Sequence, residues 1–280
     1  MANAPTKPTT PVKQESSSAS GAFASLTIPI CIAVAICIFV FILGDGSHYV
    51  GGDPENEPVP GDYFGTVHKG GVIVPIIMSY LLMVIVFSIE RFVVIGKASG
   101  TGNVEAFVKR IQSFLNSGNI DAASAECDKQ KGSVANVIKS GLKKYREMEV
   151  DTTLDVDQKS LAIQKDIEEA TALEMPMLEQ NLTIIATLVS IGTLTGLLGT
   201  VIGMIKAFGA LAASGAPNQS ALSNSISEAL INTALGIGTS AISIVMYNLF
   251  TSKIDKLTYA IDETGFSIVQ TFAASHKNSR

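Results

Sequence analysis

The sequence predicts an all-α membrane protein with four transmembrane helices and a helical cytoplasmic domain. Of its 280 residues, 47% are hydrophobic and only 16% are charged, whereas about a quarter of the residues in a typical soluble domain are charged. The apolar residues also gather in four long blocks instead of recurring at the short periods of amphipathic helices or strands. Such blocks are typical of helices that cross a bilayer.

The first block, residues 23–43, contains no charged residue. Its run from Leu26 to Leu43 would form roughly 27 Å of helix at about 1.5 Å per residue, close to the roughly 30 Å of a bilayer core. The block could instead be the apolar part of a secretory signal, since Lys7 and Lys13 precede it. The run is long for such a segment and no A-x-A-like cleavage site follows it, so we interpret it as a retained span.

The other blocks divide the rest of the chain. The third block carries one charged residue, Lys206, and the fourth carries only Glu228. The segments that we expect are a disordered tail at 1–22, spans at 23–43, 71–95, 182–213 and 226–250, an irregular loop at 44–70, a turn at 214–225, a helical domain at 96–181 and a tail at 251–280.

The positions of lysine and arginine indicate the orientation of the spans. The loop at 44–70 and the turn at 214–225 hold a single lysine between them, whereas the segments after Ile95 and Phe250 carry lysines close to the apolar blocks. Cytoplasmic flanks of membrane spans are enriched in Lys and Arg. We therefore expect both termini and the domain at 96–181 in the cytoplasm, with the loop and the turn in the periplasm.

The cysteines give no sign of a disulfide framework or a metal site. Cys31 and Cys37 lie inside an apolar block, and Cys127 has no His or second Cys at ligand spacing. The sequence contains no Walker A motif and no nucleophile elbow. We expect no catalytic residue, no bound metal, no cofactor and no nucleic-acid partner, so the chain is not predicted to be an enzyme.

Glycines mark one face of the third predicted span. Gly192 and Gly196 form one pair four residues apart, and Gly199 and Gly203 form a second. Small residues at this spacing allow close contact between helices in lipid. We expect this face to pack tightly against another helix and to support assembly of several copies.

A carboxylate opens the fourth predicted span. Glu228 and Asn232 stand four residues apart and share a helical face with Thr239. A carboxylate inside an apolar span costs about 2.5–3.5 kcal/mol on insertion scales, so it is a candidate functional residue. Glu228 could instead be a wet residue at the outer boundary, and we expect Lys206 to extend its ammonium group toward the outer surface.

Four segments are similar in order and spacing to one family of membrane proteins. The third span contains Gly-Leu-Leu-Gly-Thr-Val at 196–201, followed by Phe208, and the fourth contains Ser-Glu-Ala-Leu-Ile-Asn-Thr-Ala-Leu-Gly at 227–236. Ile-Glu-Arg-Phe at 89–92 closes the second span, and Tyr-Asn at 247–248 closes the fourth. From the second span onward the chain resembles the MotA/TolQ/ExbB proton-channel family, and ExbB and TolQ most closely.

The resemblance implies a homopentamer in a bacterial inner membrane. It would surround two copies of an ExbD- or TolR-like partner, each with one span and a membrane aspartate, and a TonB- or TolA-like protein would transmit the motion. Protons are the coupling ion in the family, and a threonine on each of two pore-lining helices faces the aspartate. Those threonines match Thr200 and Thr233, and the pore glutamate matches Glu228. We place Asn232 in the same proton pathway.

The sequence departs from the family pattern in two places. The family core has three spans with its N-terminus outside, whereas the span at 23–43 returns this N-terminus to the cytoplasm. ExbB and TolQ often carry a proline at the position of Thr193, so a proline kink is not expected here.

Two other classes of function fit part of the pattern. In a secondary transporter or simple channel, Glu228 and Lys206 would bind a solute, although spans without a visible internal repeat fit that class less well. In a structural scaffold, the glycines would only pack helices. Within the family, these residues do not separate ExbB-like energisation of outer-membrane transport from TolQ-like envelope maintenance. MotA-like rotation of a flagellum fits less well, because the cytoplasmic insert is short.

Overall fold

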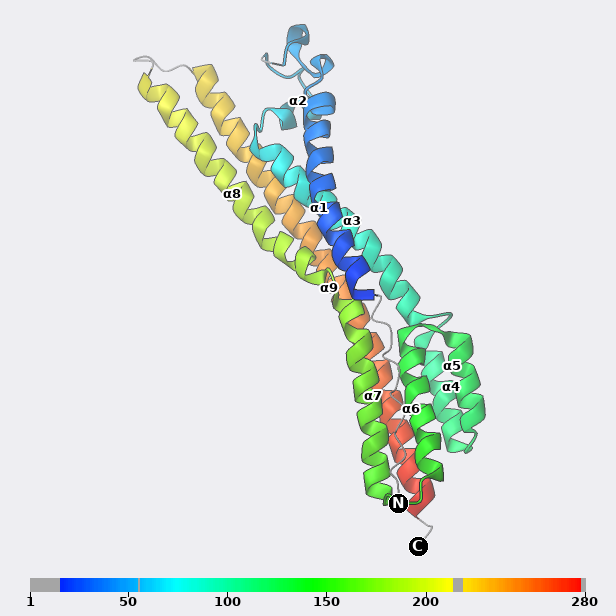
Figure 1. The fold of residues 1–280 in the computed structure, drawn as a ribbon. Coiled ribbons are helices and arrows are strands. Elements are labelled where there is room, and N and C mark those ends of the chain that lie inside the picture. The colour runs from blue at the N-terminus through cyan, green and yellow to red at the C-terminus, as the bar shows by residue number, and fades with distance from the viewer. Residues whose placement is uncertain (1–15, 55, 214–218, 278–280) are drawn as a thin grey trace, which may run out of the picture.

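The computed structural model describes residues 16–54, 56–213 and 219–277, and this part of the chain is helical without a strand. The elements are α1 (Ser16–Cys37), the π-helix η1 (Ile38–Leu43), the 3-10 turns η2 (Gly46–His48) and η3 (Val50–Gly52), α2 (Tyr63–His68), α3 (Ile73–Ser99), α4 (Val104–Asn116), α5 (Ile120–Gln130), α6 (Gly132–Val150), α7 (Val156–Glu179), α8 (Leu182–Ala213) and α9 (Gln219–Lys277). Figure 1 shows an elongated molecule with α9 running along most of its length.

Four stretches of the described chain are long and apolar enough to cross a membrane. They are Phe23–Leu43, Ile73–Asn116, Val156–Gly209 and Leu222–His276. The apolar part of each stretch coincides with one of the sequence blocks, so the expected all-helical fold with four candidate membrane helices is confirmed. In Figure 1, α8 and the first half of α9 lie side by side, and α1 packs on α3 next to them.

The predicted segment boundaries differ from the observed ones in three places, at the two tails and at the turn between the last two spans. The tail predicted at 1–22 lies outside the described residues up to position 15, and α1 already begins at Ser16. The turn predicted at 214–225 lies outside them at 214–218, and its remaining residues belong to α9. The residues predicted as a tail from 251 onward continue α9 as far as Lys277.

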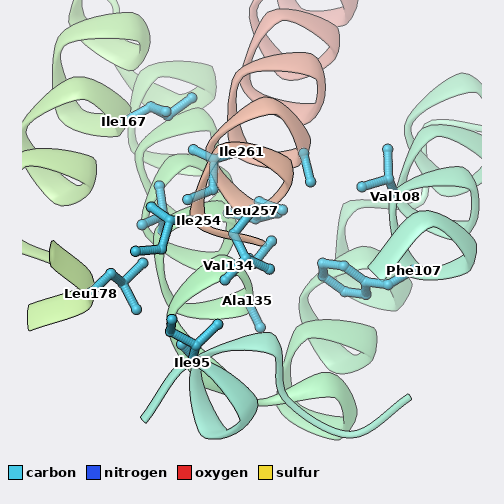
Figure 2. Packing of buried hydrophobic residues seen from close by; sticks show 14 of the residues in the cluster. Ile95, Phe107, Val108, Val134, Ala135, Ile167, Leu178, Ile254, Leu257 and Ile261 are labelled. Atoms are coloured by element: carbon cyan, nitrogen blue, oxygen red, sulfur yellow. The ribbon is translucent and has the colours of Figure 1, made fainter. Parts of the chain in front are cut away.

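The second half of α9 forms the centre of the helical domain that was predicted at 96–181. Leu257 and Ile261 of α9 are buried and lie among side chains from α4, α6 and α7, as Figure 2 shows. The amphipathic spacing of apolar residues in α4 brings Phe107 and Val108 into the same cluster. The predicted domain at 96–181 is therefore incomplete by itself, because it packs around a helix that arrives from the membrane.

The loop at 44–70 is ordered by side-chain hydrogen bonds, although its glycines and prolines predicted an irregular segment. The Asp62 carboxylate accepts a hydrogen bond from Nδ1 of His48 at 2.8 Å and also caps the N-terminus of α2. The bond from His48 and the backbone donors of the cap hold the pKa of Asp62 below its usual value. The buried Tyr49 hydroxyl donates to the Leu43 carbonyl at 3.1 Å, which ties the loop to the end of the first span.

A buried arginine holds the junction between α7 and α8. Arg91 is only 1% exposed and donates from Nη1 to the carbonyls of Met177 and Leu178, at 3.0 and 3.1 Å. Its Nε donates to the Glu90 carboxylate at 2.6 Å. Asn181 adopts a positive φ of 62° between the two helices and donates to the same carboxylate. The Glu-Arg pair thereby joins the end of α3 to the base of α8.

Candidate functional site

The glycine face of α8 packs against α9 of the same chain. A Cβ atom built on Gly196 would lie 3.0 Å from the Asn232 carbonyl oxygen, and one on Gly192 would lie 2.7 Å from Oγ of Ser240. Real Cβ atoms essentially never approach closer than 3.0 Å. Glycines at these positions therefore let the two helix backbones come together.

Gly199 and Gly203 allow the same close approach of α8 and α9 further along the interface. A Cβ atom on Gly203 would lie 2.8 Å from the Cβ of Ala229, and one on Gly199 would overlap the Cβ of Asn232. All four glycines that the sequence singled out thus face α9 within one chain. Their close packing needs no second copy, although the sequence analysis also linked them to assembly.

Thr233 lies in this interface and links the two helices through its hydroxyl group. Its Oγ1 lies 3.3 Å from the Gly196 carbonyl of α8 and 3.3 Å from the Ala229 carbonyl of its own helix. One hydroxyl proton is shared between these two acceptors, so the oxygen keeps its capacity to accept a hydrogen bond. The side chain is half-buried and still reachable from outside the helix pair.

Thr200 lies beside a hollow on the exposed side of α8. The hollow measures about 510 Å³ and is otherwise lined by apolar side chains, among them Val201, Ile205 and Phe208. The Thr200 hydroxyl donates to the Leu197 carbonyl at 2.6 Å within its own helix. It is therefore a half-buried hydroxyl in an apolar setting, and its oxygen is able to accept a further hydrogen bond.

Glu228 forms an ion pair with Lys206 across the outer ends of α8 and α9. Nζ of Lys206 lies 2.6 Å from Oε1 of Glu228, and the two side chains are 51% and 15% exposed, respectively. The carboxylate rests on Gly71 at the start of α3, where a Cβ atom would come within 2.6 Å of Oε1. We expected Lys206 to extend toward the outer surface. Its ammonium group instead forms an ion pair with Glu228 of the neighbouring helix α9.

Asn232 lies inside the helix bundle, and its place in the proton pathway remains a prediction. Its side chain is fully buried, and Nδ2 donates to the Gly70 carbonyl at 2.9 Å. Oδ1 has no hydrogen-bond partner among the described residues. Helical spacing puts Asn232 on the face of Glu228, as predicted, but that face points toward α3. In the structure, this hydrogen bond joins α9 to the segment just before α3.

The sequence model of the MotA/TolQ/ExbB proton channel family matches residues 129–263. This stretch contains Thr200, Glu228, Thr233 and all four interface glycines. Just under half of the chain therefore matches this family's domain. The match begins at the end of α5 and includes α8 and the part of α9 up to residue 263, so it covers part of the helical domain as well as the candidate site.

Individual relatives of the family have ExbB and TolQ names. A protein of Synechocystis sp. named as ExbB-like is 34% identical over 88 residues, covering 31% of this chain and 42% of the relative. The Tol-Pal system protein TolQ of Pseudomonas aeruginosa is 25% identical over 55% of the chain and 67% of its own length. The biopolymer transport protein ExbB of Xanthomonas campestris is 28% identical over 42% of the chain and 46% of its own length. The chain thus spans about two fifths to two thirds of these relatives.

Two contacts between α8 and α9 were not predicted from the sequence. The Lys206–Glu228 ion pair could have been predicted, because each residue is the single charge in its apolar block and the two charges are opposite. The 2.8 Å hydrogen bond from Thr193 to Ser240 could not have been predicted, since nothing in the sequence sets the register of α8 on α9. Thr193 occupies the position at which ExbB and TolQ often carry proline.

Proposed function

We propose that this chain is the proton-channel subunit of an ExbB-like motor in a bacterial inner membrane. Proton flow through the complex would change the position of a partner, which drives transport across the outer membrane through a TonB-like protein. The family domain supports a proton-channel energiser of ExbB or TolQ type. The finer assignment to outer-membrane transport is our proposal.

The observation that carries the proposal is the placement of Thr200 and Thr233 on the two helices of the α8–α9 hairpin. Each hydroxyl is half-buried and keeps an accepting oxygen. A hydroxyl donates to an ionised carboxylate and accepts from a protonated one, so it serves both states of a partner aspartate. In an apolar hollow such as that beside Thr200, the hydroxyl is well suited to receive a carboxyl group.

The proposed assembly is a homopentamer around two copies of a single-span, ExbD- or TolR-like partner. Val201, Ile205 and Phe208 of α8 are exposed beside Thr200, and Leu230 and Ile237 are exposed on α9. Such apolar faces require cover from lipid or protein. Copies of the chain and the partner helix would supply part of that cover.

Affinity purification from native membranes tests the assembly. We expect a multimer of the chain together with a small single-span protein that carries an aspartate in its span, measured by native mass spectrometry. Recovery of monomers alone would count against the motor and would favour a transporter or a scaffold.

Similarity to TolQ of Pseudomonas aeruginosa makes envelope maintenance the second candidate function. Expression of the chain with its partner in cells lacking ExbB, and separately in cells lacking TolQ, distinguishes the two. We expect recovery of energy-dependent outer-membrane uptake, and we expect it to be lost with Thr233→Val and kept with Thr233→Ser. Recovery of envelope integrity alone would replace the ExbB assignment with the TolQ one.

A further inference from the structure

A cavity of about 860 Å³ lies between the end of α3, the start of α4 and the middle of α9. Phe92 and Ile95 line it from the last turns of the second apolar block. Lys253, which also lines it, is the first charged residue of α9 after Phe250. The cavity therefore opens where the apolar spans give way to charged residues, at the expected boundary between the bilayer and the cytoplasm.

The lining of this cavity combines an apolar wall with charges of both signs. Ile95, Val108 and Leu257 are buried at its wall, and Phe92 is exposed. The charged lining residues are Lys109, Lys253, Lys256, Glu105, Asp255 and Glu263. The two signs are equally represented, so the lining is complementary to a ligand that carries both charges and an apolar part.

The lysines of this lining have ammonium groups available for a ligand. The Lys253 ammonium lies 3.9 Å from the centre of the Phe92 ring, where it is held at the cavity without a carboxylate. Lys256 and Lys109 are exposed and form no ion pair with another described residue. Lysines at a membrane boundary place their apolar stems along the acyl region and their ammonium groups at the phosphate level.

We propose that the cavity binds a zwitterionic glycerophospholipid of the cytoplasmic leaflet, with phosphatidylethanolamine as the headgroup class. Lys253 and Lys256 bind the phosphate, the carboxylates of the lining receive the headgroup ammonium, and an acyl chain covers Phe92 and Ile95. The volume lies within the range of about 300–1,000 Å³ that small-molecule sites occupy, enough for a headgroup and part of a chain. The lipid would link α3 to α9, independently of the proton mechanism.

Reconstitution followed by native mass spectrometry tests this proposal. The oligomer is reconstituted into vesicles of phosphatidylethanolamine and, in parallel, phosphatidylglycerol, and is then extracted in mild detergent. Lys253→Ala with Lys256→Ala removes the phosphate ligands. Gly96→Leu fills the cavity, because Gly96 lines it and a Cβ atom there meets no atom within 4 Å.

Matched controls are Lys143→Ala, an exposed lysine of α6 outside the cavity, and Gly238→Leu, which also points into open space. We expect the wild-type chain and both controls to retain phosphatidylethanolamine. The lysine variant should retain about tenfold less, since it loses hydrogen bonds between charged groups. Gly96→Leu should reduce retention to a similar extent, because its side chain occupies the space of the lipid.

Equal retention by the cavity variants and the controls would overturn the site. Preferred retention of phosphatidylglycerol would overturn the zwitterionic headgroup. A wild-type oligomer that holds no lipid but dissociates with Gly96→Leu would show that a neighbouring copy of the chain fills the cavity instead. Loss of proton-driven activity elsewhere in the molecule would leave this lipid measurement unchanged, so failures of the two proposals are separable.

Discussion

Glu228 and Lys206 show how a single charge is accommodated in each of two apolar helices. A lone carboxylate or ammonium in a span is expensive, and the cost falls when an opposite charge binds it. Here the carboxylate is mostly buried against Gly71, whereas the lysine remains half exposed. The pair fixes the outer ends of α8 and α9 relative to each other and to α3.

Substitution of both members of this pair should destabilise the fold by less than the sum of the two single substitutions. Glu228→Gln or Lys206→Met leaves the other charge without its partner, at a cost of about 1–3 kcal/mol, less than the roughly 3–5 kcal/mol of a fully buried pair. The double variant removes both charges and should cost about 1 kcal/mol less than the sum of the singles. Thermal unfolding in detergent measures this, and strictly additive effects would show that the two residues act independently.

The α8–α9 hairpin depends on glycine at the scale of the element. Gly199→Leu should destabilise the chain by about 1–3 kcal/mol, because the new side chain must displace Asn232 or push the two helices apart. Gly238→Leu is the matched control, since a Cβ atom at Gly238 meets nothing within 4 Å. Unfolding of the monomeric chain at low concentration is the measurement. Equal stability of the two variants would contradict the packing of Gly199 against α9 of the same chain. A change in subunit number without a loss of stability would show that the glycines lie between copies of the chain.

The spans could be predicted from sequence because their apolar blocks are long and nearly free of charge. The extent of α9 could not, because the apolar block ends at Phe250 and only packing shows that Leu257 and Ile261 of the same helix enter the domain core. The break before α8 was also hidden. It depends on Asn181 and on Arg91, which is distant in sequence and reaches the last carbonyls of α7.

The residues of the candidate site could be identified from the sequence, but the directions in which their side chains point could not. Thr200 and Thr233 were identified by resemblance and both lie on the α8–α9 hairpin. The spacing between Glu228 and Asn232 predicted a shared helical face, but spacing does not predict the direction in which that face points. The direction depends on how α9 packs against α3, which the Asn232–Gly70 hydrogen bond records.

At the scale of the whole molecule, one helix belongs to both parts of the chain. α9 contains 59 residues, about 88 Å of helix at about 1.5 Å per residue. Its first half carries Thr233 and Glu228, and its second half lies in the core of the helical domain. A displacement of the first half would therefore be transmitted directly to the core of that domain, with the Arg91 junction as the second connection.

Proton flux through the reconstituted complex tests the central claim most directly. Vesicles would contain the chain with its single-span partner, and internal acidification would be followed after a pH gradient and a membrane potential are imposed. With Thr200→Val and Thr233→Val together, we expect flux to fall about 10- to 100-fold, the equivalent of a lost hydrogen bond to a charged group. The complex should remain assembled, and the corresponding Thr→Ser pair should keep most of the flux. Wild-type flux in the double valine variant would contradict the hydroxyl mechanism.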